Sequence, residues 1–345
     1  MSGASLPPLK TRKLGRTNVN LTELGLGTAP LGDLFDRVED DDAAAVIQCA
    51  WEGGARYFDT SPWYGRGQAE HRLGRALYRK PRSEFIISSK IGRVFRRPLK
   101  PGPVKDQWLG GLQFEPVFDY GYDGVMRSFE DSLQRLGING IDLLLIHDLD
   151  AWSHRSQANV DAYLVQLATT GWRALDELRS QGIIKGIGAG LNMMGMIPRF
   201  LDLFDIDFFL LAMRYTLLEQ DVLDSEFPRC AERGVGVIIG GGYNSGILAT
   251  GAVPGAMYNY EPAGPAILER VRKIEQVCAR HRVPLPAAAL QFPLGHPIVA
   301  SIIPGAISRA QVEQNLAAFR HPIPADLWAE LKHEKLIRAA APIPN

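Results

Sequence analysis

The feature of this sequence that most restricts its fold is a regular alternation of short apolar runs with segments of helical periodicity. The apolar runs have the length of β-strands, and the segments between them repeat apolar residues every three or four positions, which is typical of helices packed on one side. Near-continuous apolar strands that alternate with helices predict a parallel sheet covered by those helices. The first expected strand ends near Gly27, and the others cover residues 56–59, 85–90, 141–147, 184–188, 208–215, 235–240 and 300–303.

Eight such repeats fit a closed sheet better than an open one, so the chain is expected to form an α/β fold, a (β/α)8 TIM barrel. Two short alternating runs around Gly-Arg-Thr-Asn, from residue 12 onwards, predict a β-hairpin before the barrel. No linker rich in Pro, Gly or Ser divides the 345 residues, which predicts a single domain over 1–345. The expected helices cover residues 41–52, 67–77, 124–136, 171–181, 196–204, 224–233, 265–281 and 308–319, with an extra helix over 286–294.

Two stretches interrupt the alternation, one after the third strand and one after the seventh. Residues 93–123 are rich in Gly, Pro and aromatic residues, and residues 240–264 are rich in Gly, Ala and Tyr. In such barrels the loops that follow the strands build the active site, and long loops are usually lids or binding walls. These two loops are therefore expected at the site, with disordered insertions as the alternative.

The composition favours an enzyme that acts on a small molecule. Acidic and basic residues balance at 38 each, so no strong overall charge points to nucleic acid or to a membrane surface as a partner. The segment MSGASLPPLKTRKLG lacks the apolar core of a signal peptide, and no run of 18 apolar residues occurs. A cytoplasmic protein is expected, its oligomeric state left open. The three cysteines show no metal-binding spacing.

Three of the expected strands end in a titratable residue directly after an apolar run. These residues are Asp59 after RYF, Lys90 after FIISS and His147 after LLLI. Strand ends converge at the mouth of a (β/α)8 barrel, so a carboxylate, an ammonium and an imidazole are expected to share one desolvated space. Taken singly, His147 could be a satisfied core histidine and Asp59 could cap a turn. Lys90 is harder to explain without function, because a buried ammonium needs a counter-ion and Asp59 is the obvious one.

A tyrosine lies in the loop that follows Asp59. Tyr64 stands beside Trp63 and just before an expected helix, so its phenol can project over the barrel mouth, although it could also simply pack there. A neighbouring Lys ammonium favours the phenolate, so the pKa of Tyr64 is expected to fall. The phenol would then be a usable general acid or base.

Four motifs, in order over nearly the whole chain, carry a resemblance to the aldo-keto reductases: DTSPWYGRGQAEHRLGRAL, IISSKIGR, DLLLIHD and SIIPGAISRAQVEQN. The resemblance implies a nicotinamide cofactor as the hydride carrier and an active site without a metal. It implies that Tyr64 relays the proton and that Lys90 with Asp59 tunes this phenol. His147 would hydrogen-bond and orient the reacting oxygen.

The last strand and helix are expected to hold the cofactor phosphates, with Ser308 as the N-cap of the helix. Relatives that prefer NADP usually carry Lys and Arg where this chain has Gly305 and Gln311. NAD should therefore be accepted at least as well as NADP, although Arg309 could still contact a phosphate. Asn315 matches the adenine-contacting Asn of the family. The other expected cofactor residues are Gly27, Thr28, Asn192, Gly240, Tyr243, Ser245 and Gln314.

Three departures from the family pattern affect the nicotinamide. The usual Ser-Asn after the fifth strand is replaced by Gly190-Leu191-Asn192, so Asn192 takes the carboxamide role only if the loop is shifted by one residue. Ala212 stands where a Gln is expected. Gly240 replaces the aromatic residue that usually stacks on the ring, and Tyr243 is a nearby candidate to cover it.

The segments GGGYNSGIL and FDYGYDGVMRSFEDSLQRLG and the Trp-Tyr pair resemble a subset of the family that oxidises cyclic hemiacetals to lactones. This subset contains aldose 1-dehydrogenases of the L-fucose and D-threo-aldose type and, as the alternative, pyridoxal 4-dehydrogenase. Two further alternatives are a general NADPH-dependent aldehyde reductase and a barrel that binds cofactor without turnover, as a channel-regulating or chaperone-like subunit. An aromatic wall for the substrate is expected from Trp63, Trp108, Phe118 and Tyr120.

Overall fold

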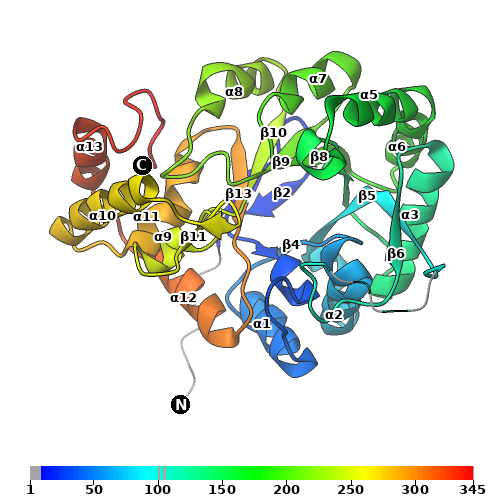
Figure 1. Ribbon diagram of the computed structural model, residues 1–345, viewed down its shortest axis with the longest axis horizontal. Helices are drawn as coiled ribbons and strands as arrows, with labels where there is room; N and C mark the ends of the chain where they lie inside the picture. The colour runs from blue at the N-terminus through cyan, green and yellow to red at the C-terminus, as the bar shows by residue number, and fades with distance from the viewer. Residues whose placement is uncertain (1–8, 100–101, 103, 105, 345) are drawn as a thin grey trace.

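Eight parallel strands form the centre of the computed structural model, which describes residues 9–99, 102, 104 and 106–344. Neighbouring strands follow the order β13-β10-β9-β8-β7-β5-β4-β3, and a parallel bridge between Leu24 and Ile302 closes the ring. Helices surround the strands (Figure 1). The predicted (β/α)8 barrel is therefore confirmed. Its strands are β3 (Leu26–Gly27), β4 (Tyr57–Asp59), β5 (Ile86–Arg96), β7 (Leu143–His147), β8 (Gly186–Leu191), β9 (Phe208–Ala212), β10 (Gly236–Gly240) and β13 (Val299–Ile303).

The predicted N-terminal hairpin closes one end of this barrel. It consists of β1 (Thr11–Lys13) and β2 (Asn20–Thr22), which pair antiparallel. Its apolar side chains Leu14, Val19 and Leu21 pack in one buried cluster with residues inside the barrel, among them Leu143 and Phe208 at the first positions of their strands. The hairpin thus covers the end at which the strands begin. The opposite end, where the strands finish, is left for the site.

The outer helices follow the expected order, with additions. The chain between β7 and β8 forms a continuous helical stretch, because α5 runs through a π-helical turn at Leu167–Gly171 into α6. The sequence predicted only the last part of it, since two threonines and a glycine interrupt the periodic pattern there. Helices α4, α5, α9 and α13 were not predicted. The helices are α1 (Asp40–Glu52), α2 (Gln68–Leu77), α3 (Tyr122–Leu136), α4 (Ala151–His154), α5 (Gln157–Gln166), α6 (Trp172–Ser180), α7 (Met196–Leu203), α8 (Val222–Glu232), α9 (Ile247–Thr250), α10 (Pro265–Arg280), α11 (Leu285–Gln291), α12 (Arg309–Arg320) and α13 (Ala325–His333).

Both long loops contain regular structure at their described positions. Strand β5 continues past Lys90 and pairs antiparallel with β6 (Glu115–Asp119), so the expected loop begins as a β-ribbon. The segment after β10 contains α9 and a small hairpin of β11 (Met257–Tyr258) and β12 (Glu261–Pro262). The predicted strand over 208–215 was too long, since Met213 has a φ of 64° and ends the extended conformation.

No helix in the described residues is both long enough and apolar enough to cross a membrane.

Candidate active site

A buried ion pair joins the ends of β4 and β5. Lys90 Nζ lies 2.7 Å from Asp59 Oδ2 and donates a second hydrogen bond, of 2.8 Å, to the carbonyl oxygen of Thr60. Ser88 Oγ donates to the other carboxylate oxygen of Asp59 at 2.6 Å. Lys90 and Asp59 are each exposed by no more than 2%. The expectation that Asp59 is the counter-ion of Lys90 is confirmed, and the pair keeps both charges satisfied within the barrel.

The chain turns sharply after β4 and thereby presents Tyr64 beside this pair. Gly65 and Arg66, with φ of 64° and 55°, form a left-handed turn directly after Tyr64. Added to Gly65, a Cβ would lie 2.7 Å from the carbonyl oxygen of Gly32, so a glycine is needed at this position. The ring centroid of Tyr64 lies 4.7 Å from Lys90 Nζ and 5.7 Å from the ring of His147. The four residues predicted from the strand ends and their loop are therefore brought together.

The expectation of a lowered pKa for Tyr64 is wrong for this structure. Desolvation in the barrel mouth raises the pKa of the phenol well above its usual value, and the nearby carboxylates of Asp59 and Asp148 raise it further. Arg93 acts in the opposite direction with a smaller effect. The ammonium of Lys90 and the carboxylate of Asp59, which form an ion pair, act on this phenol with opposite signs, so the ammonium does not bring about a lowered pKa.

The imidazole of His147 is fixed in orientation and kept neutral. Burial lowers the pKa of His147 well below its usual value, and the positive charges of Arg93 and Lys90 lower it further. Its Nδ1 lies 3.0 Å from Ser61 Oγ, and this oxygen already accepts a hydrogen bond from the backbone N–H of Trp63. A proton on Nε2 is favoured because this nitrogen lies 3.4 Å from the carboxylate oxygen Oδ2 of Asp148, and the Ser61 hydroxyl then donates to Nδ1. A neutral imidazole with Nε2–H can donate to a substrate oxygen.

A cavity of about 920 Å³ opens above these residues. Tyr64, Lys90 and His147 line it, together with Trp63, Trp108 and Phe118 of the expected aromatic wall. The ring of Trp108 lies 5.8 Å from that of Tyr64 and 5.7 Å from that of Trp63.

Tyr120 does not line this cavity. It is fully buried, and its hydroxyl donates to the carbonyl oxygen of His147 at 2.8 Å. Its ring is nearly parallel to that of Phe118, at a centroid distance of 6.5 Å. Tyr120 therefore lies behind the wall and supports Phe118 and His147, because its position directly after β6 directs it inward.

The sequence reasoning missed several residues that line the cavity, of which Arg93 and Asp148 matter most. Arg93 follows Lys90 on the same strand, and Asp148 directly follows His147. Arg93 Nη2 donates to Asp148 Oδ2 at 3.1 Å. The signal that identified Asp59, Lys90 and His147, a charged residue at a strand end, is present at Asp148 and would have found it, whereas Arg93 lies within β5 and carries no such signal.

Some of the expected cofactor residues surround the cavity and others do not. Asn192 lines it, and its Nδ2 donates to Asp148 Oδ1 at 2.8 Å. Ala212, at the end of β9, also lines it. Thr28 is buried below, where its Oγ1 donates to the carbonyl oxygen of Asp59 at 2.9 Å. Gly27 lies against β13, since an added Cβ would be 2.9 Å from the carbonyl oxygen of Ile303.

The remaining expected cofactor residues gather around α12 and the segment after β10. Ser308 is the N-cap of α12, as predicted, and its side chain accepts from the backbone N–H of Gln311. Tyr243 donates to Asn315 Oδ1 at 2.8 Å, which ties the segment after β10 to this helix. Gly240 ends β10, Ser245 Oγ accepts from the backbone N–H of Tyr260 at 2.9 Å, and Gly305 and Gln314 are exposed.

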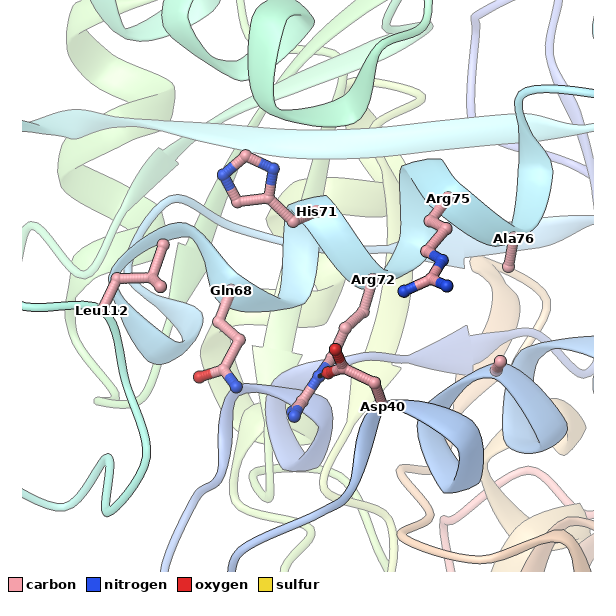
Figure 2. A pocket seen from close by; sticks show the side chains of 8 residues that line it. Asp40, Gln68, His71, Arg72, Arg75, Ala76 and Leu112 are labelled. Carbon is pink, nitrogen blue, oxygen red and sulfur yellow. Dashed lines mark hydrogen bonds and ion pairs between the residues drawn. The ribbon is translucent and has the colours of Figure 1, made fainter.

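A second pocket, of about 450 Å³, lies between α1 and α2 (Figure 2). Asp40, Gln68, His71, Arg72, Arg75 and Leu112 are among the residues that line it. Arg72 is held there by ion pairs with Asp33 and Asp40, at 2.7 and 2.9 Å. None of the expected site residues lines this pocket. Within the described residues, no group of three or more His, Cys, Asp or Glu side chains could hold a metal ion.

Comparisons with known proteins identify the family of this chain. The model of the aldo/keto reductase family matches residues 23–334. The chain is 44% identical to pyridoxal 4-dehydrogenase of Microbacterium luteolum, over 94% of this chain and 97% of that one. It is 37% identical to D-threo-aldose 1-dehydrogenase of a Pseudomonas species, over 91% of this chain and 94% of that one.

The structure is similar to the holo form of an aldo-keto reductase of Bacillus halodurans. The TM-score is 0.74 at 25% sequence identity, and the match covers 96% of this chain and 98% of that one. The fold, the family model and the relatives lead to one conclusion. The chain belongs to the aldo/keto reductase family and is an NAD(P)-dependent oxidoreductase that acts on a small-molecule substrate.

Proposed function

We propose that this enzyme oxidises a cyclic hemiacetal to a lactone, with Tyr64 as the group that accepts the hydroxyl proton. The observation that carries the proposal is the shared cavity in which Tyr64, Lys90 and His147 face aromatic side chains. The names of the two relatives support it, since pyridoxal and aldoses both exist as cyclic hemiacetals. Oxidation of such a hydroxyl removes one proton and one hydride.

The residues divide this work between them. His147 donates from Nε2 to the reacting oxygen and orients it, as its neutral state allows. Tyr64, as phenolate, removes the proton of the same hydroxyl, and the Lys90 ammonium beside its ring stabilises the phenolate. Asp59 holds Lys90 in place through the 2.7 Å contact. A bound nicotinamide supplies the acceptor for the hydride that leaves the carbon.

The walls of the cavity favour a flat or partly apolar substrate. Trp63 and Trp108 meet edge to face, with an interplanar angle of 88°, and Phe118 lines the cavity as well. Such a wall suits a pyridine ring and also the apolar face of a sugar. Pyridoxal is therefore the first substrate to test, and aldoses of the L-fucose and D-threo type are the second.

A screen of NAD reduction tests this proposal. The enzyme is expected to form NADH with pyridoxal or with one of L-fucose, D-arabinose and L-galactose, at a higher kcat/KM than it reduces simple aldehydes with NADPH. The reference substrate is a simple aldehyde that cannot cyclise, such as benzaldehyde. Faster NADPH-dependent reduction of benzaldehyde than NAD-dependent oxidation of every hemiacetal would instead identify a general aldehyde reductase.

The residues at α12 fit the phosphates of a dinucleotide. The first turn of this helix contains no acidic residue, and Ser308 caps it, so its N–H groups suit an anion. Arg309, the basic residue closest to the cap, forms ion pairs with Glu52 and Glu313. Because no free cation stands at the positions of Gly305 and Gln311, a 2′-phosphate gains little there. We therefore propose NAD as the preferred cofactor.

The expected result is a higher kcat/KM with NAD than with NADP. Gln311→Arg should shift the ratio towards NADP by about tenfold or more, because it adds a charge-assisted contact to the 2′-phosphate. Gly305→Lys is a poorer variant, since its Cβ would lie 2.5 Å from Pro30 Cγ. The matched control is Ala317→Arg, which places the same charge on an exposed position of α12. A wild-type enzyme that strongly prefers NADP would refute the proposal that α12 lacks a binding site for the 2′-phosphate.

A further inference from the structure

We propose that Arg93 is a specificity-determining residue, which donates a hydrogen bond from Nη1 to a substrate hydroxyl near the reacting carbon. The inference rests on the proposed function, because it defines which hemiacetals the site accepts. It concerns a residue outside the group that moves the proton.

The guanidinium of Arg93 is buried and only partly used. The residue is 5% exposed, and its guanidinium carbon lies 5.0 Å from the ring centroids of both Trp63 and Phe118. Its Nη2 donates to Asp148 Oδ2 at 3.1 Å and to Ser153 Oγ at 3.5 Å. Its Nη1 has no hydrogen-bond partner among the described residues. An unpaired buried donor of a charged group is costly, so a ligand that pairs with it gains free energy.

The position of Arg93 relative to His147 indicates which substrate atom it meets. Asp148 Oδ2 lies 3.1 Å from Arg93 Nη2 and 3.4 Å from His147 Nε2. The guanidinium is thus separated by one carboxylate oxygen from the nitrogen that holds the reacting oxygen. The Asn192 side chain donates a hydrogen bond to the other carboxylate oxygen of Asp148, which fixes the position of this carboxylate between Arg93 and His147. We therefore infer that the substrate hydroxyl closest to Arg93 is one near the reacting carbon.

The charges around Arg93 favour a hydroxyl or phenolate oxygen of an overall neutral molecule. Asp148 neutralises the guanidinium, so the site offers directional donors without a net positive charge. A free carboxylate on the substrate would be repelled by Asp148. An aldose has its 2-hydroxyl on the carbon next to the anomeric carbon, and pyridoxal has its ring 3-hydroxyl one carbon further from the reacting carbon. Both candidate substrates therefore present a hydroxyl near the reacting carbon.

The test removes the guanidinium donor of Arg93 by substitution and the acceptor hydroxyl by a deoxy substrate, first separately and then together. The kcat/KM of wild type and Arg93→Met is measured with pyridoxal and its 3-deoxy analogue, and with L-fucose and 2-deoxy-L-fucose. We expect Arg93→Met to lose about 10- to 100-fold on the substrate that the wild type oxidises, the range of a hydrogen bond to a charged group. On the matching deoxy analogue the loss should be about tenfold smaller, because the contact is already absent there and only the effect of Arg93 on Tyr64, His147 and Asp148 remains.

Two further variants separate this role from a structural one. Arg93→Lys keeps the charge opposite Asp148 but loses the second donor, and should share most of the loss on the parent substrate. The double variant Arg93→Met with Asp148→Asn removes both charges, which keeps the fold testable if the single variant is unstable. Equal losses on parent and analogue in these variants would show that Arg93 only supports Asp148 and His147, and would overturn the inference alone. A wild type that oxidises neither hemiacetal would overturn the proposed function with it.

Discussion

Tyr64→Phe is expected to fold and to bind the cofactor normally, while its turnover falls by at least about 100-fold, the usual scale for a positioned proton transfer. The substitution removes only the hydroxyl, so the ring contacts with Trp108 and His147 are retained. Steady-state kinetics give the loss in kcat, and a fluorescence titration with NADH checks that cofactor binding is unchanged.

The matched control is Tyr163→Phe, which deletes a phenol that lines the same cavity but does not neighbour Lys90. This variant is expected to stay within a few-fold of wild type. Near-normal turnover of Tyr64→Phe would refute the assignment of Tyr64 as the proton acceptor. Equal losses in both variants would mean that the cavity tolerates no loss of a hydroxyl.

Lys90→Met is expected to move the pH dependence of oxidation to higher pH and to lower the rate at pH 8 by at least about 100-fold. The active form of Tyr64 is the phenolate, so the rate rises with pH through the coupled titration of the site. Burial already raises the pKa of the phenol. Removing the ammonium leaves the Asp59 carboxylate without its counter-ion, and this negative charge raises the pKa of Tyr64 further. A larger share of the phenol is then protonated at any given pH, and oxidation slows.

The same substitution has a cost in stability that must be separated from the effect on the rate. An unpaired carboxylate at the position of Asp59 is expected to lower the free energy of unfolding by about 3–5 kcal/mol. The double variant Lys90→Met with Asp59→Asn removes both charges and should recover most of this loss in urea unfolding. It should recover part of the rate at pH 8, because the carboxylate that raises the pKa of Tyr64 is removed as well. A pH profile of the single variant that coincides with that of wild type would contradict the role of Lys90.

Much of the fold and the core of the site could be predicted because they depend on local pattern. Each barrel strand is a short apolar run, and the strands that end in Asp59, Lys90 and His147 must converge once the barrel closes. The contact between Lys90 and Asp59 follows from the need of a buried ammonium for a counter-ion. The N-cap at Ser308 follows from helix chemistry alone.

The other features of the site depend on contacts between residues that are far apart in the sequence, and the local sequence pattern does not contain these contacts. The pKa of Tyr64 is set by desolvation, which raises it, and by the opposing charges of Asp59 and Lys90 beside the phenol. Tyr120 and Phe118 are two positions apart on one segment, yet only Phe118 reaches the cavity, because the turn after β6 directs Tyr120 beneath His147. Arg93 lies at the cavity because β5 extends past Lys90 and pairs with β6, and the sequence pattern did not predict this extension.

We propose that this enzyme oxidises a cyclic hemiacetal through Tyr64, and the product of a single reaction shows whether it does. The wild-type enzyme is incubated with NAD and pyridoxal, and in a parallel reaction with NAD and L-fucose. NADH formation is followed by absorbance, and the separated products are analysed by mass spectrometry. The expected product is a lactone that is lighter than the substrate by two hydrogen atoms. It should form in an amount equal to that of NADH, and it should be absent with Tyr64→Phe. Absence of NADH formation with both hemiacetals, or lactone formed equally well by Tyr64→Phe, would contradict the proposal.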